Sequence, residues 1–85
     1  MQKPVSLSEV QRRVIQFFHE HPHAVETVRG IATWIACEPK LIEEALEGLV
    51  GRKWLSADET SAVRGYSLTR DERFLTQIQD LMEPS

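Results

Sequence analysis

Apolar residues recur at helical spacing in the first segment of the chain, where they form one face: Val10, Val14, Phe17 and Phe18. This helix has two candidate N-caps, because Ser6 is followed by Glu9, and Ser8 by Gln11, at the spacing of a capping box. The helix is expected to stop at His21-Pro22-His23, since proline cannot continue a helix and restricts the residue before it. A short extended connector over residues 24–26 follows.

Two more helices are expected after this connector. Thr27 is placed to cap the second helix, whose buried stripe consists of Val28, Ile31, Ala32 and Ile35. Pro39 then stands at the first position of a third helix, where its missing N–H is harmless. The core face of the third helix consists of Ile42, Ala45, Leu46 and Leu49, and Gly51 is expected just past its end.

The pattern changes after the third helix and predicts a β-hairpin followed by a fourth helix. Two short strand candidates, residues 54–55 and 66–68, are separated by a polar tip. Thr69 and Glu72 then fit a capping box for a helix over residues 70–82. The order of elements is therefore helix, helix, helix, hairpin, helix.

This order resembles the winged helix-turn-helix domain of transcription regulators of the MarR, PadR and ArsR kind. Three segments carry the resemblance: TVRGIATWI at residues 27–35, the stretch 39–55, and GYSLT at residues 65–69. Members typically have a glycine just before the aromatic residue that follows the third helix, where this chain has Lys53. The resemblance implies one mainly α domain with a small β-hairpin (α+β) over residues 1–85, with its core at residues 6–69.

The resemblance also implies binding to double-stranded DNA, with the third helix in the major groove and the hairpin loop, or wing, gripping the backbone. Carried over position by position, the groove-facing residues would be Glu38, Pro39, Lys40, Glu43, Glu44 and Glu47, and wing contacts would fall within residues 57–64. The cations that could contact phosphate are Arg29, Lys40, Arg52, Lys53 and Arg64. On this interpretation the protein is a transcription regulator.

The charge of the chain favours a second interpretation. Ten Lys and Arg against 13 Asp and Glu give a net charge of −3, whereas DNA-binding domains are usually basic. Three glutamates on the outer face of the third helix would repel phosphate. The alternative is therefore a protein-interaction module that offers a basic protein partner the surface of Trp34, Glu43, Glu44 and Glu47. Convergence of the cations on one face would favour DNA, and their scatter would favour the interaction module.

The fourth helix has an apolar face made by Phe74, Ile78 and Leu81. This face can cover the core of the domain or pair with its mate in a homodimer. We expect dimerisation, because regulators of this size usually contact two half-sites.

The sequence offers no catalytic constellation, so we expect no enzyme activity and no cofactor. His19, His21 and His23 with Cys37 lack the spacing of a zinc site, and no metal is predicted. Cys37 is interpreted as a small core residue, with a redox-sensing thiol as the alternative. No run is long and apolar enough for a membrane span, no secretory signal is present, and we expect a cytoplasmic protein.

Overall fold

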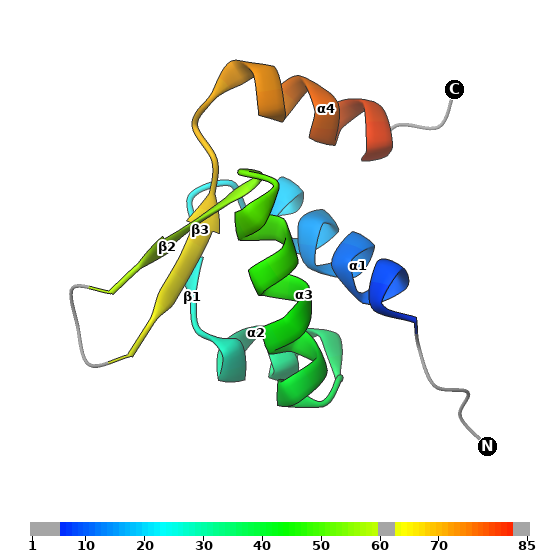
Figure 1. The fold of residues 1–85 in the computed structure, drawn as a ribbon, viewed down its shortest axis with the longest axis vertical. Coiled ribbons are helices and arrows are strands. Elements are labelled where there is room, and N and C mark those ends of the chain that lie inside the picture. Colours follow the sequence, from blue (N-terminus) through cyan, green and yellow to red (C-terminus); the bar gives the residue numbers. More distant parts are fainter. Residues whose placement is uncertain (1–5, 60–62, 83–85) are drawn as a thin grey trace.

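The computed structural model describes residues 6–59 and 63–82 of the chain. Helix α1 (Leu7–Glu20), strand β1 (Val25–Glu26), α2 (Val28–Ile35) and α3 (Pro39–Gly51) precede β2 (Leu55–Asp58), β3 (Gly65–Leu68) and α4 (Glu72–Met82). The β2–β3 hairpin projects away from the helices, and α4 lies across the top of the view (Figure 1). The predicted order of elements and the mainly helical α+β class are confirmed.

The three strands form one antiparallel sheet in the order β1-β3-β2. Val25 pairs with Ser67 at one edge, and Leu55 pairs with Leu68 at the base of the hairpin. Strand β2 continues to Asp58, so the hairpin has longer strands and a shorter tip than the sequence predicts. The predicted wing contacts fall partly on residues 60–62, which lie outside the described residues.

The core forms where the apolar faces of the helices meet the inner side of the sheet. The predicted core residues of α1 and α3 are buried, and Ile31 and Ala32 of α2 join them. Tyr66, Leu55 and Leu68 contribute from the hairpin. Each large apolar side chain buried in this way stabilises the fold by about 1.5–3 kcal/mol. The apolar faces predicted from the sequence are therefore buried, and the opposite face of α3 is left exposed to solvent.

The first two helices begin at predicted caps. The Ser6 hydroxyl accepts a hydrogen bond from the backbone N–H of Glu9 at 3.2 Å, which selects the first of the two candidate caps. The Thr27 hydroxyl accepts from the backbone N–H of Gly30 at 3.1 Å. Each hydroxyl satisfies one N–H that the first helical turn leaves without a partner.

The end of α3 differs from the prediction. Gly51 is the last helical residue rather than the residue just past the end, and Arg52 is the C-cap. Lys53 adopts the left-handed conformation with φ 67°, which glycine adopts at lower cost. Its N–H donates to the carbonyl oxygen of Val50 at 2.9 Å. Lys53 therefore fills the turn position at which members of the regulator families have a glycine.

The fourth helix also begins later than predicted. It starts at Glu72, and Asp71 is the residue that caps it, since its carboxylate accepts from the backbone N–H of Arg73 at 2.9 Å. The Arg73 side chain also donates to this carboxylate and lowers the pKa of Asp71. The predicted Thr69–Glu72 capping box is wrong, because the N–H of Thr69 continues the strand by donating to the carbonyl oxygen of Trp54 at 3.0 Å.

Helix α4 packs against α1 through part of its apolar face. Ile78 is only 1% exposed and belongs to the core of the domain. Phe74 is half-buried and Leu81 is 38% exposed, so these two residues are the part of the predicted dimer face that the domain leaves accessible. Among the described residues, no helix has the length and apolar character needed to cross a membrane.

Candidate nucleic-acid interface

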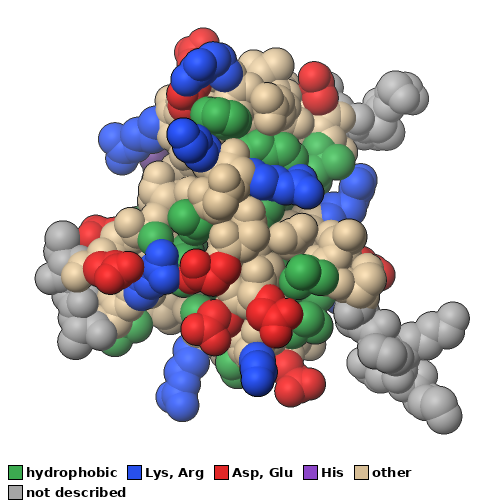
Figure 2. All heavy atoms as spheres, in the orientation of Figure 1, with side chains coloured by type: hydrophobic (Ala, Val, Ile, Leu, Met, Phe, Trp, Pro, Cys, Tyr) green, Lys and Arg blue, Asp and Glu red, His purple; other side chains and the backbone are tan. Residues whose placement is uncertain are grey.

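The outer face of α3 lies between α2 and the hairpin and is acidic. Glu43, Glu44 and Glu47 are all exposed, as are Glu38 and Lys40 at the start of the helix. Acidic side chains gather over α3 on the face shown in Figure 2, with few cations between them. The predicted groove-facing residues are therefore accessible, and the surface they form repels phosphate unless nearby cations compensate.

Glu47 contacts the hairpin directly. Arg64 Nη1 donates to Glu47 Oε2 at 2.7 Å, and the Tyr66 hydroxyl donates to the same oxygen at 3.1 Å. The Arg64 guanidinium lies over the Tyr66 ring, 5.4 Å from its centroid. These contacts join α3 to β3 and to the residue before it, so Glu47 ties the loop end of the hairpin strands to α3.

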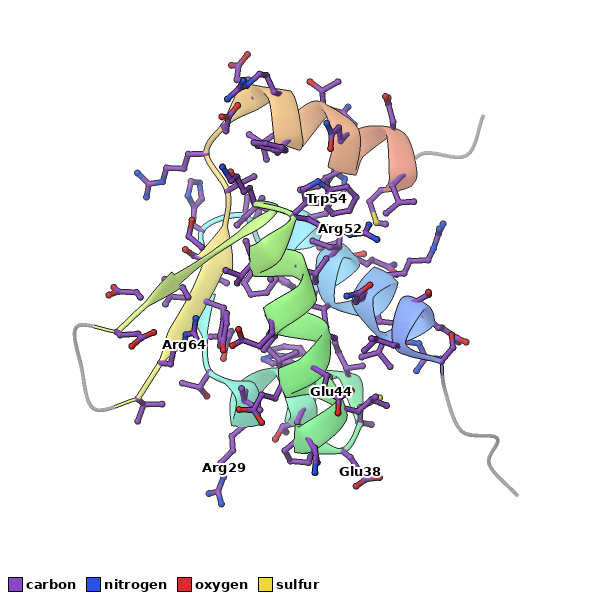
Figure 3. All side chains as sticks on the ribbon, viewed as in Figure 1. Arg29, Glu38, Glu44, Arg52, Trp54 and Arg64 are labelled. Carbon is purple, nitrogen blue, oxygen red and sulfur yellow. The ribbon has the colours of Figure 1, made fainter. Side chains whose placement is uncertain are left out.

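Arg64 is also close to a second carboxylate. Its Nε lies 3.2 Å from Glu59 Oε2, but the geometry is not that of a hydrogen bond, and Nε is buried without a hydrogen-bond partner. Figure 3 shows Arg64 at the loop end of the hairpin strands, on the side that faces α3. A cation held between two glutamates is largely neutralised, so Arg64 presents little positive charge in this conformation.

The same environment acts on Tyr66, which is 2% exposed. Burial raises the pKa of Tyr66 above its ordinary value of 10.0, and the hydrogen bond to Glu47 and the charge of Glu47 raise it further. The positive charge of Arg64 opposes this effect. The phenol therefore stays neutral and keeps donating to Glu47 throughout the physiological pH range.

A small groove of about 230 Å³ brings two of the predicted DNA-contacting cations together. Arg29 from the start of α2 and Arg64 from the hairpin line it, with Glu43 from α3. The remaining lining residues are Thr27, Val28, Val63 and Tyr66. The groove thus lies at the junction of α2, α3 and the wing, beside the exposed face of α3.

Arg52 and Lys53 lie at the opposite end of α3. A helix of 13 residues spans about 20 Å, so these two cations are far from Arg29 and from the first turn. The guanidinium of Arg52 lies 5.7 Å from the centroid of the Trp54 ring, and Figure 3 shows the two side by side. The five predicted DNA-contacting cations therefore divide between the two ends of the helix.

Trp34 is 64% exposed and lies on the surface of the domain. Its described ring neighbours are Phe17 of α1, with 5.5 Å between ring centroids, and the α1 C-cap His21, at 6.0 Å. These contacts direct Trp34 toward α1, whereas Glu47 contacts the hairpin.

Cys37 and the histidines show no arrangement for metal binding within the described residues. Cys37 is half-buried and packs against the core. Within residues 6–59 and 63–82, no group of three or more His, Cys, Asp or Glu side chains is arranged to hold a metal ion.

The contacts of Glu47 with Arg64 and Tyr66 could not be predicted from the sequence. The partners are 17 and 19 residues apart, and no local motif marks them.

Comparison with known proteins gives matches at the level of structure. Neither a protein-family model nor a curated protein sequence matches the chain. A structure described as a possible transcriptional regulator from Methanosarcina mazei Go1 has a TM-score of 0.69 at 13% identity, over 88% of this chain and 68% of that one. The AntR antimony-specific transcriptional repressor has a TM-score of 0.65 at 14% identity, over 92% and 66%.

A third similar structure was solved together with nucleic acid. It is a cysteine-to-serine mutant of Lactococcus lactis ZitR in complex with DNA, with a TM-score of 0.63 at 21% identity, over 94% of this chain and 63% of that chain. The chain thus spans about two thirds of the length of these neighbours. The predicted fold is confirmed: the chain is a winged helix-turn-helix, like these structures of transcription regulators.

Proposed function

We propose that this chain is a transcription-regulator-type protein that binds duplex DNA through the cations around the first half of α3. The observation that carries the proposal is the groove in which Arg29 and Arg64 flank the exposed face of α3. Lys40 lies in the first turn of the same helix and is exposed. The likeness to transcription regulators, and to a neighbour solved with DNA, supports this choice of partner.

The carboxylates of α3 are expected to weaken the affinity for DNA. Glu47 occupies the side of Arg64 that a phosphate would use, so DNA must compete with Glu47 for this guanidinium. Glu43 and Glu44 add repulsion beside the same surface. We therefore expect weak binding at physiological salt that becomes much tighter at low salt, since phosphate contacts dominate the affinity.

The proposal is tested by fluorescence anisotropy of a labelled random duplex titrated with the protein at several salt concentrations. The logarithm of the binding constant should fall linearly with the logarithm of salt, with a slope of about −2 to −3 per protomer for two or three neutralised phosphates. Absence of binding at the lowest salt concentration contradicts the proposal.

A second candidate function is supported by the exposed carboxylates and by the division of the predicted cations between the two ends of α3, which favours the interaction module. Glu43 and Glu44 have no ion-pair partner among the described residues, and they form a negatively charged surface that matches a basic protein partner. On this candidate α3 docks protein and does not approach DNA. Replacing both glutamates by glutamine distinguishes the two functions, because the affinity changes in opposite directions. Binding to a basic protein partner should weaken, whereas binding to DNA should tighten.

We also propose that the chain forms a homodimer through α4, with Phe74 and Leu81 in the contact. Leu81 is 38% exposed, and Phe74 is only half-buried in the domain. Sedimentation equilibrium should give a dimer for the wild-type chain and a shift toward monomer for Phe74→Lys. A wild-type protein that stays monomeric at every accessible concentration contradicts this part of the proposal.

A further inference from the structure

A hollow of about 420 Å³ lies where the loop after α1 meets the end of β3 and the start of α4. Figure 1 shows this loop beside the end of β3, below the first turn of α4. The residues that line the hollow are Pro22, His23, Leu68, Thr69, Arg70 and Leu75. None of them belongs to α3 or to the proposed DNA and dimer contacts. The hollow is therefore a surface that the proposed function leaves unused.

Three of the lining residues are apolar and come from three different parts of the fold. Leu68 at the end of β3 is 9% exposed, and Leu75 in α4 is partly buried against the core. Pro22 in the loop after α1 adds an exposed ring. An apolar side chain from a partner can therefore cover surface that otherwise contacts water.

The other three lining residues can each donate a hydrogen bond. Arg70 is exposed and forms no ion pair within the described part of the chain. Thr69 Oγ1 accepts from the backbone N–H of Asp71 at 3.1 Å, which leaves its hydroxyl proton to donate, and His23 adds an exposed imidazole. None of the described lining residues is Asp or Glu, and the carboxylate of Asp71 is held by Arg73 at 2.8 Å. In a chain of net charge −3, this hollow favours a carboxylate.

The shape of the hollow favours a peptide over a small ligand. Pro22, His23 and Arg70 are exposed, so the hollow is open to solvent on the sides that they form. Small-molecule sites usually enclose about 70–90% of the surface of their ligand. A peptide needs less enclosure, because it can insert one side chain into a pocket and leave its backbone at the rim.

We propose that this hollow binds a short acidic segment of a partner protein, in which a leucine is flanked by glutamate or aspartate. The leucine covers Leu68 and Leu75, and one flanking carboxylate pairs with Arg70. Guanidinium suits this role because its planar fork can donate two parallel hydrogen bonds to a carboxylate. Thr69 and His23 donate to the second flanking carboxylate. This interaction is separate from DNA binding, and its test needs no DNA.

The test is a titration of the labelled protein with synthetic peptides, followed in a proton–nitrogen correlation spectrum. The acidic probe is acetyl-Gly-Glu-Leu-Glu-Gly-amide. The neutral probe has Gln in place of each Glu, and the polar probe has Ser in place of Leu. The acidic probe should shift the amide resonances of Leu68, Arg70 and Leu75 in a saturable manner. The other two probes should each bind at least about fivefold more weakly, since each lacks one of the two recognised groups.

Variants assign the recognition to the hollow. Arg70→Gln should weaken binding of the acidic probe by about fivefold or more and leave the weak binding of the neutral probe unchanged. Arg29→Gln is the matched control, since it removes the same charge from α2, outside the hollow, and should leave both affinities unchanged. Arg70→Lys keeps the charge but loses the fork and should give an intermediate affinity. Leu75→Gln should weaken binding of both probes, because it removes an apolar wall.

Four outcomes overturn the proposal. One is the absence of a saturable shift at the lining residues with the acidic probe. Equal affinity for the acidic and neutral probes, or equal losses in Arg29→Gln and Arg70→Gln, would show that the hollow does not recognise the carboxylate. Isovalerate that binds as tightly as the acidic probe would make the hollow a small-molecule site. Shifts at the same residues that grow with protein concentration, without any peptide, would mean that a second copy of the chain occupies it. The dispersion of each spectrum reports whether the variant is folded, and the comparison of probes on the wild type needs no variant.

Discussion

The two ends of α3 belong to one helix of 13 residues, yet their surroundings carry opposite charges. The first half exposes Glu43 and Glu44, and Glu47, just past the middle of the helix, contacts the hairpin. The far end has Arg52 over Trp54 and shares a pocket with Arg12. The net charge of −3 does not give the local charge at either end of α3. Which partner a small domain binds therefore depends on where its charges lie.

The largest expected effect comes from removing charge at the first half of α3. Glu43→Gln/Glu44→Gln should tighten binding to random duplex DNA by about tenfold, since two charges that repel phosphate are lost. The measurement is anisotropy at fixed low salt. The control is Glu72→Gln/Asp80→Asn, which removes the same charge from exposed positions on α4. Unchanged affinity in the first variant would mean that DNA does not approach this face.

A smaller effect is expected from releasing Arg64. Glu47→Gln removes the carboxylate that neutralises this guanidinium and should tighten DNA binding by about threefold, less than the double variant. The stability of the fold should change little, because the Arg64–Glu47 pair is partly exposed and such pairs contribute about 0–1 kcal/mol. Weaker DNA binding in this variant would show that the hairpin geometry set by Glu47 matters more than its charge.

The same variant changes the titration of Tyr66, the single tyrosine of the chain. The folded pKa of Tyr66 is raised above 10.0, so the stabilisation from its neutral phenol is complete below pH 10 and is lost as pH rises through the folded pKa. Tyrosinate absorbance should therefore give a midpoint above 10 in the wild type and a lower one in Glu47→Gln. Burial still raises the pKa of Tyr66 in the variant, and identical midpoints would contradict the assigned contact.

Two further effects concern stability rather than binding, at the turn that ends α3. Gly51→Ala should stabilise the protein by about 1 kcal/mol, because Gly51 is helical and an added Cβ meets no atom within 4 Å. Lys53→Gly should stabilise it by about 0.5–1 kcal/mol by relieving the left-handed strain. Thermal unfolding measures both changes. Destabilisation by Lys53→Gly would show that side-chain contacts of Lys53 outweigh its backbone strain.

Much of the fold could be predicted because its signals are local. The caps Ser6 and Thr27 and the apolar face of α3 all depend on residues within a few positions of one another. The start of α4 could not be predicted in this way. Thr69 and Asp71 both resemble caps, and the choice depends on the hydrogen bond from Thr69 to Trp54 across the sheet.

The sequence predicts which residues belong to the candidate site but not how they contact one another. The exposure of Glu43, Glu44 and Glu47 follows from helical spacing. The engagement of Glu47 by Arg64, and the separation of Arg52 from Arg29, depend on how the hairpin and α2 meet α3 in space. Sequence spacing alone does not contain that information.

On the proposed function, DNA contacts the first half of α3 and not its far end. The direct measurement is the salt dependence of duplex binding by Arg29→Gln/Lys40→Gln and by Arg12→Gln/Arg52→Gln, which remove equal charge. The first variant should reduce the magnitude of the slope by about 2, and the second should leave it at the wild-type value. Equal reductions in both, or a reduction in the second alone, would contradict the account.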